Sequence, residues 1–204
     1  MQRDNSYRLV LASASPARRA LLKAAGIDAD VLVSGVDESV VEAEDAYTVS
    51  LALARMKART VAARMPGEPG VLVLGCDSVL AFDGEVLGKP ADPAVATKRW
   101  QAMRGRSGVL HTGHYLTELV TGRQAEEVAT TVVHFADVTD EEIEAYVATG
   151  EPLNVAGAFT IDGLGGAFVE RIEGDAGNVI GLSLPLLRRL LGELGVAITD
   201  LWRD

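Results

Sequence analysis

Short apolar runs alternate with longer amphipathic segments along this 204-residue chain, and that alternation restricts its fold more than any other feature. RLVLA at 8–12 and VLVLGC at 71–76 are continuous apolar runs, typical of strands that are buried on both faces. Residues 46–65 place apolar side chains at helical spacing. The alternation of strands with helices predicts one α/β domain over residues 1–204, with a mixed sheet at its centre.

Local patterns predict where the elements begin and end. Ser15 before Pro16 is typical of a helix start, Asp83-Gly84 of a two-residue hairpin turn, and Thr139 with Glu142 of a capping box. Residues 150–181 are rich in glycine and predict loops and short strands. We expect helices over 16–25, 46–65, 92–103, 139–149 and 184–194, and strands over 8–12, 30–34, 71–76, 79–82, 85–87, 109–120 and 126–135.

Charge and composition exclude several classes of function. The 29 acidic and 19 Lys and Arg residues give a net charge of −10, which disfavours binding to nucleic-acid polymers or anionic membranes. The single cysteine, Cys76, excludes an intramolecular disulfide, and the three histidines lack metal-ligand spacing. No apolar run is long enough for a membrane span or a convincing signal peptide. We therefore expect a soluble, cytoplasmic protein.

Common catalytic motifs fail at defined positions. GEVLGKP at 84–90 has three residues between its glycines, whereas a phosphate-binding P-loop has four. GLSLP at 181–185 ends in proline where a nucleophile elbow needs glycine. The sequence does not support a hydrolase that uses a catalytic triad.

The first helix begins with an unusual pair of cations. Arg18 and Arg19 lie in its first turn, where positive charge opposes the helix dipole. One explanation is an anion bound at the free backbone N–H groups, with Ser13 and Ser15 as hydroxyl donors. The other is a serine-capped helix with two solvent-exposed arginines. The residues alone leave both explanations open.

An ordered set of motifs resembles the Maf family of nucleoside triphosphate pyrophosphatases over nearly the whole chain. The motifs are LASASPAR at 11–18, VDE at 36–38, ARMKA at 54–58, GCDS at 75–78, EVLGKP at 85–90, AGAF at 156–159, GLGG at 163–166 and VIGLSLP at 179–185. The resemblance implies an elongated Maf/ITPase-like α/β fold, with a central mixed sheet flanked by helices and two lobes that enclose a cleft. It also implies a homodimer and a divalent cation, Mg²⁺ or Mn²⁺, as cofactor.

The resemblance further implies hydrolysis between the α- and β-phosphates, which yields a nucleoside monophosphate and pyrophosphate and clears unwanted nucleotides from the pool. It assigns Asp77 as the catalytic proton acceptor, and Glu38 with Asp77 as the metal site. Because Asp77 follows an apolar strand, we also expect it at a strand end, where α/β proteins usually bind ligands. The phosphate-binding residues implied are Ser13, Ser15, Arg18, Lys57 and Lys89, with Arg19 matched only in some members.

Three positions track base specificity in the family, and here they are Ala17, Ser78 and Asp162. Ser78 is similar to the members that act on dTTP and UTP, Asp162 to those that act on 7-methyl-GTP, and Ala17 to neither. We therefore expect a broader or different nucleotide preference.

A nucleotide-binding protein of this kind has two alternatives to pyrophosphatase activity. One is a nucleotide-binding regulator of cell division and septum formation without turnover, and the other is a phosphatase that releases orthophosphate. The joint presence of Asp77, Glu38, Lys57 and Lys89 favours turnover, because a sensor needs no acid to activate water.

Overall fold

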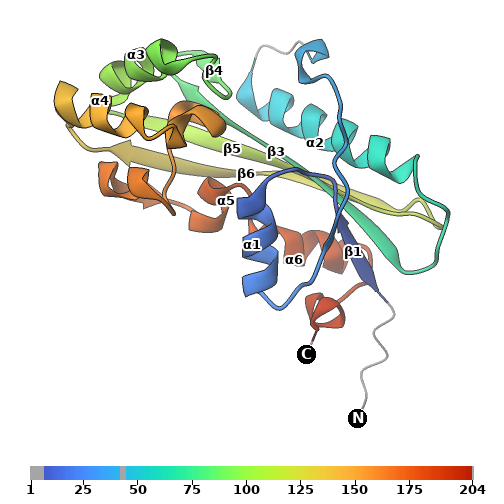
Figure 1. Ribbon diagram of the computed structural model, residues 1–204. Coiled ribbons are helices and arrows are strands. Elements are labelled where there is room, and N and C mark those ends of the chain that lie inside the picture. Colours follow the sequence, from blue (N-terminus) through green and yellow to red (C-terminus); the bar gives the residue numbers. More distant parts are fainter. Residues whose placement is uncertain (1–6, 42–44, 204) are drawn as a thin grey trace.

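One mixed sheet forms the centre of the protein in a computed structural model that describes residues 7–41 and 45–203 (Figure 1). Within this part of the chain the sheet has seven strands in the order β2-β1-β3-β5-β6-β7, and β4 pairs with β3. β1 is parallel to β2 and β3, whereas the other pairs are antiparallel. The strands are β1 (Arg8–Leu11), β2 (Asp30–Val31), β3 (Val71–Phe82), β4 (Glu85–Leu87), β5 (Ser107–Glu118), β6 (Gln124–Phe135) and β7 (Val169–Glu173).

Helices cover both faces of the sheet, which confirms the predicted α/β class. α1 and α6 lie on one face, α2 lies on the other, and α3 and α4 lie near the end of the sheet that carries β4 (Figure 1). The α-helices are α1 (Pro16–Ala24), α2 (Ala46–Ala62), α3 (Pro93–Met103), α4 (Asp140–Ala148), α5 (Ala176–Ile180) and α6 (Leu184–Glu193). The 3-10 helices are η1 (Glu38–Val40), η2 (Glu151–Asn154), η3 (Ala156–Ala158), η4 (Leu164–Phe168) and η5 (Ile198–Leu201). No helix in the described part of the chain is long and apolar enough to cross a bilayer.

The two predicted helix starts and the predicted hairpin turn are confirmed. Ser15 caps α1 by accepting from the Arg18 backbone N–H, and Thr139 and Glu142 form the capping box of α4. Asp83 and Gly84 both have positive φ, 54° and 83°, as a two-residue type I′ hairpin turn requires. These features depend on contacts between residues at most three positions apart, which explains why the sequence alone reveals them.

Two strand predictions are wrong. The strand predicted over 30–34 ends at Val31, because β1, its partner, ends at Leu11. The strands predicted over 71–76 and 79–82 form one continuous strand, so Asp77 lies in the middle of β3 and not at a strand end. The reason is pairing with β5, whose Gly113 and Thr112 stand opposite Asp77 and Ser78.

Two glycines bring α2 unusually close to the sheet. A Cβ at Gly75 would stand 2.1 Å from the Ala54 carbonyl oxygen, and one at Gly113 would stand 2.2 Å from that of Ser50. Both distances are below van der Waals contact, so larger residues would force α2 away from β3 and β5. The same approach brings Lys57, one turn after Ala54, against β3.

β3 presents its polar residues to both faces of the sheet. Successive side chains of a strand alternate between faces, so Asp77 points to the α2 face and Ser78 to the face covered by α1. On the edge away from β5, β1 pairs with β3 as far as Leu74, and β4 begins its pairing at Leu80. Asp77 and Ser78 thus lie in a stretch of β3 that neither β1 nor β4 covers.

Candidate active site

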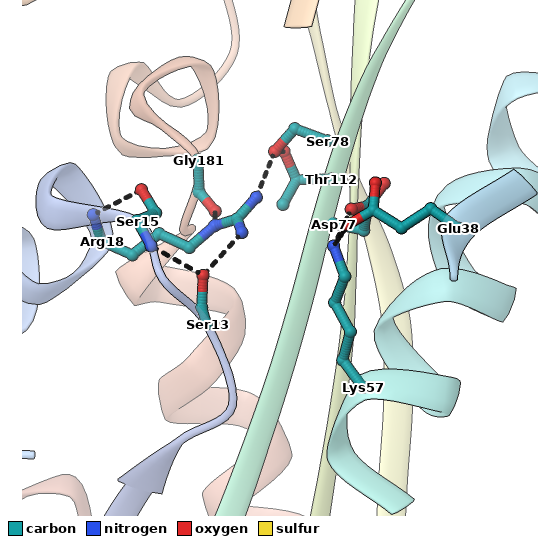
Figure 2. A network of polar contacts seen from close by, with 9 residues as sticks. All are labelled: Ser13, Ser15, Arg18, Glu38, Lys57, Asp77, Ser78, Thr112 and Gly181. Carbon is teal, nitrogen blue, oxygen red and sulfur yellow. Dashed lines mark hydrogen bonds and ion pairs between the residues drawn. The ribbon is translucent and has the colours of Figure 1, made fainter. Parts of the chain in front are cut away.

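A buried lysine joins two carboxylates on the α2 face of β3 (Figure 2). Lys57 Nζ lies 2.5 Å from Asp77 Oδ1 and 2.7 Å from Glu38 Oε1. Lys57 and Asp77 are buried, with 8% and 7% of their surface exposed, whereas Glu38 is exposed. The prediction that Lys57 and Asp77 share a site therefore has geometric support, and Lys57 does not extend into solvent.

The buried environment of Asp77 changes how readily its carboxyl group binds a proton. Burial raises the pKa of Asp77 above its ordinary value, while the charges of Lys57 and Arg18 act in the opposite direction. Oδ1 accepts from Lys57, and no hydrogen bond from the described residues reaches Oδ2. Oδ2 is thus the oxygen available to accept a proton.

Glu38 approaches this cluster from a short turn. It begins the 3-10 helix η1, and Asp37 caps that helix by accepting from the backbone N–H and the hydroxyl of Ser39. These bonds lower the pKa of Asp37. Of these two acids, Glu38 forms an ion pair with Lys57, whereas Asp37 serves as the helix cap. Glu42 and Glu44, from the same acidic stretch, lie outside the described residues.

Arg18 forms a second cluster on the opposite face of β3 (Figure 2). Its guanidinium donates from Nε to the Gly181 carbonyl at 2.7 Å, from Nη1 to Ser13 Oγ at 3.1 Å and from Nη2 to Ser78 Oγ at 3.0 Å. A guanidinium has five N–H donors, so two are left after these three bonds. Arg18 is buried, contrary to the explanation by two exposed arginines, whereas Arg19 is exposed.

Ser13 and Ser15 are organised as hydroxyl donors beside Arg18. Ser13 Oγ accepts from the Ser15 backbone N–H at 3.2 Å and from Arg18, and Ser15 Oγ accepts from the Arg18 backbone N–H at 3.3 Å. Neither hydroxyl donates to another group in the described part of the chain. Each proton therefore stays available to an anion at the start of α1.

The remaining predicted residues make none of the hydrogen bonds that build the two clusters. Lys89 and Asp162 are exposed, and neither forms a hydrogen bond or ion pair with Asp77 or Arg18 among the described residues, whereas Ala17 is half-buried and directly precedes Arg18 in α1. Arg19 lines a hollow of about 360 Å³ together with Ser15, Lys23 and other residues of the α1 start. The predicted roles of these residues in binding phosphate and base stay predictions.

Sequence reasoning did not single out three buried or half-buried residues, of which two contact the segments around Arg18 and one contacts the loop after Asp162. Thr112 contacts Ser78, and His114 contacts Ser183 beside the Gly181 turn. Glu151 accepts from the Tyr146 and Thr160 hydroxyls and from the backbone N–H groups of 164 and 165, and so fixes the loop that follows Asp162. Sequence alone gives no indication of these contacts, because each joins segments that only the fold brings together.

The carboxylates fit a divalent cation only together with a phosphate ligand. The described residues contain no group of three or more His, Cys, Asp or Glu that could hold a metal. Mg²⁺, however, is commonly held by one or two carboxylates together with substrate phosphates and water. Asp77 and Glu38, which both reach the Lys57 ammonium, match that smaller requirement.

The fold and the two clusters define an α/β protein that gathers buried cationic and acidic groups around one strand. A family model described as Maf-like protein matches residues 8–194. A nucleoside triphosphate pyrophosphatase of Salinispora tropica is 66% identical over 197 residues, which cover 96% of this chain and 87% of that protein. Proteins of the same name from Streptomyces avermitilis and a Synechococcus strain are 60% and 57% identical, with 96% and 95% of this chain covered and 94% and 98% of theirs. The chain belongs to the Maf family, as its motifs predicted.

His114 supports the turn that holds Arg18, and we expect it to make stability depend on pH. Nδ1 donates to the Thr112 carbonyl and Nε2 accepts from the Ser183 N–H, both at 2.9 Å, so the ring is neutral. Burial lowers the pKa of His114 from 6.5 to about 4. Between these values the unfolded chain binds the extra proton and the folded chain does not, so stability falls as pH falls. The full loss is about 3 kcal/mol.

Denaturant unfolding between pH 4 and 7 measures this dependence. In His114→Gln, which cannot be protonated, the free energy of unfolding should vary less with pH over that window than in the wild type. His134→Gln is the matched control, since His134 lies near the surface beside Glu173. Equal pH slopes for the wild type and His114→Gln would contradict the prediction.

Proposed function

We propose that this protein hydrolyses nucleoside triphosphates between the α- and β-phosphates, releasing a nucleoside monophosphate and pyrophosphate. The observation that carries the proposal is the buried Asp77, paired with Lys57 and one residue away from Ser78, which binds Arg18 on the other face of β3. Lys57 and Arg18 place one cation on each face of β3 beside Asp77. This arrangement suits a negatively charged triphosphate that lies along the stretch of β3 that neither β1 nor β4 covers. The names of the relatives support the same reaction.

Each group has a role that its position suits. Arg18, Ser13 and Ser15 bind phosphate oxygens at the start of α1, and Lys57 binds a phosphate from the opposite face. Asp77 Oδ2 accepts a proton as water attacks the α-phosphorus. The bond from that phosphorus to the bridging oxygen breaks, and pyrophosphate leaves with the charge that Arg18 and Lys57 stabilise. Lys89 is proposed as a further phosphate ligand.

A divalent cation, Mg²⁺ or Mn²⁺, completes the proposal. It would be held by Glu38 and Asp77 together with phosphate oxygens, and it would neutralise phosphate charge and lower the pKa of a bound water. Asp77 and Glu38 would orient the attacking water, and the burial of Asp77 would keep bulk solvent from competing for its proton.

The test is hydrolysis with products resolved. The protein is incubated with standard and methylated triphosphates and with Mg²⁺, Mn²⁺ or excess EDTA. We expect monophosphate and pyrophosphate in equal amounts with either metal, and a loss of at least about a hundredfold in EDTA. Orthophosphate as the first product would indicate the phosphatase, and tight binding without any product would indicate the regulator.

The same panel tests base preference. Ala17 leaves a small side chain, and Asp162 an exposed carboxylate, at two positions that track specificity in the family. We expect activity on several bases. A sharp preference for dTTP and UTP over all other triphosphates would contradict that expectation.

A further inference from the structure

A chain of hydroxyl groups connects Arg18 to the interior of the sheet. Ser78 on β3 stands opposite Thr112 on β5, and their hydroxyl oxygens are 2.9 Å apart. Thr112 Oγ1 lies 3.1 Å from the carbonyl oxygen of Asn178, which belongs to α5. Thr112 is fully buried, and Figure 2 shows its hydroxyl next to that of Ser78, which also contacts the Arg18 guanidinium.

The direction of these hydrogen bonds follows from counting protons. A carbonyl oxygen can only accept, so Thr112 gives its single hydroxyl proton to Asn178. Ser78 must then be the donor to Thr112. With its proton committed, Ser78 accepts from Arg18 Nη2 at 3.0 Å. The order is Arg18 to Ser78 to Thr112 to Asn178, with one donor and one acceptor at each step.

We propose that Thr112 is a positioning residue for Arg18 and that Ser78 serves the phosphate end of the site and not the base. The proposal rests on the proposed function, because it assigns Arg18 to the triphosphate. Thr112 fixes the rotamer of the Ser78 hydroxyl so that a lone pair faces the guanidinium. While the chain is intact, Ser78 has no proton to donate to a nucleobase.

Arg18 depends on this contact because the three groups that accept its hydrogen bonds belong to three different segments of the chain. Ser13 precedes α1, Gly181 follows α5 and Ser78 lies on β3. Of the three acceptors, only Ser78 belongs to the strand that carries Asp77. Losing the Thr112 hydroxyl leaves the bonds to Ser13 and Gly181 in place but lets the Ser78 hydroxyl rotate, which weakens the bond between Nη2 and the strand that bears Asp77.

The experiment compares three valine and serine variants. Thr112→Val removes the hydroxyl at nearly constant volume, and Thr112→Ser restores it. Thr131→Val is the matched control, because Thr131 is equally buried and bonds to Asp175 and Asn178 of the same region without reaching Ser78. Affinity for inorganic triphosphate is measured by calorimetry in EDTA, and kcat/KM is measured for dTTP and GTP with Mg²⁺.

We expect Thr112→Val to weaken binding of inorganic triphosphate by about 3- to 10-fold, the range for one lost hydrogen bond. Its kcat/KM should fall by a similar factor for both nucleotides, so that their ratio stays constant. Thr112→Ser should recover most of the loss, and Thr131→Val should bind inorganic triphosphate like the wild type, even if its melting temperature falls.

Three results would overturn the proposal: unchanged binding in Thr112→Val, the same loss in Thr131→Val, or a changed ratio of dTTP to GTP. The last would assign Ser78 to the base. If the wild type binds inorganic triphosphate but hydrolyses nothing, the proposed function fails, while the binding measurements still decide the role of Thr112.

Discussion

Asp77→Asn is expected to lower kcat about a thousandfold, within the range that a positioned general base contributes. Asparagine keeps the size of the side chain but cannot accept the proton of an attacking water at Oδ2. It also removes the negative charge that Lys57 contacts at 2.5 Å, although Glu38 stays as a second anionic partner at 2.7 Å. Single-turnover formation of monophosphate measures the chemical step directly.

Binding separates the catalytic role from a structural one. We expect Asp77→Asn to bind a non-hydrolysable triphosphate in EDTA at least as well as the wild type, because a negative charge near the phosphates is gone. Asp83→Asn is the matched control: Asp83 belongs to the hairpin that follows the same strand, is exposed and pairs with Arg106. A kcat for Asp77→Asn within tenfold of the wild type would exclude Asp77 as the base.

Lys57→Met is expected to lower kcat/KM by about 10²- to 10³-fold, as the loss of a preorganised charge at a reacting group does. Methionine has a similar length and keeps the packing of the lysine stem between α2 and β3. The variant loses a proposed phosphate ligand and leaves the buried Asp77 without its nearest cation. Lys98→Met, at an exposed position on α3, is the control for the substitution itself.

The pH dependence of kcat/KM distinguishes a catalytic effect of Lys57→Met from a loss of stability. Burial raises the pKa of Asp77, and the charge of Lys57 lowers it, so removing Lys57 raises that pKa further. A base works when ionised, and activity falls as pH falls through its pKa. The acid limb of kcat/KM should therefore move to higher pH in Lys57→Met. A limb at the wild-type position would mean that Asp77 is not the titrating group.

Local sequence was sufficient for most of the fold. The helix start at Ser15, the capping box at Thr139 and the hairpin turn at Asp83-Gly84 are contacts within one turn of chain, and each was predicted. The long strands β5 and β6 were also predicted to within two residues at each end, whereas β3 was predicted as two shorter strands. The strand over 30–34 was predicted too long, because its length depends on where its partner β1 ends.

The candidate site likewise combines residues that the sequence predicted with contacts that only the fold decided. Motif resemblance singled out Asp77, Lys57, Glu38 and Arg18, and the fold brings the first three into one cluster. Motif resemblance could not predict the orientation of the Arg18 side chain, which turns back from the start of α1 to contact residues 60 and 163 positions away. Sequence reasoning did not single out Thr112, because no pattern in the sequence distinguishes this buried threonine from the other residues of β5.

The sequence by itself determined which elements form and which residue types are available for the chemistry, because caps, turns and apolar periodicity act between near neighbours. Only the tertiary structure decided where those residues meet. Pairing with β5 makes β3 continuous through Asp77, and Gly75 and Gly113 let α2 approach closely enough for Lys57 to reach it. Strand alternation then sends Ser78 to the opposite face, toward Arg18. These outcomes depend on register and close packing between distant segments, which no local pattern encodes.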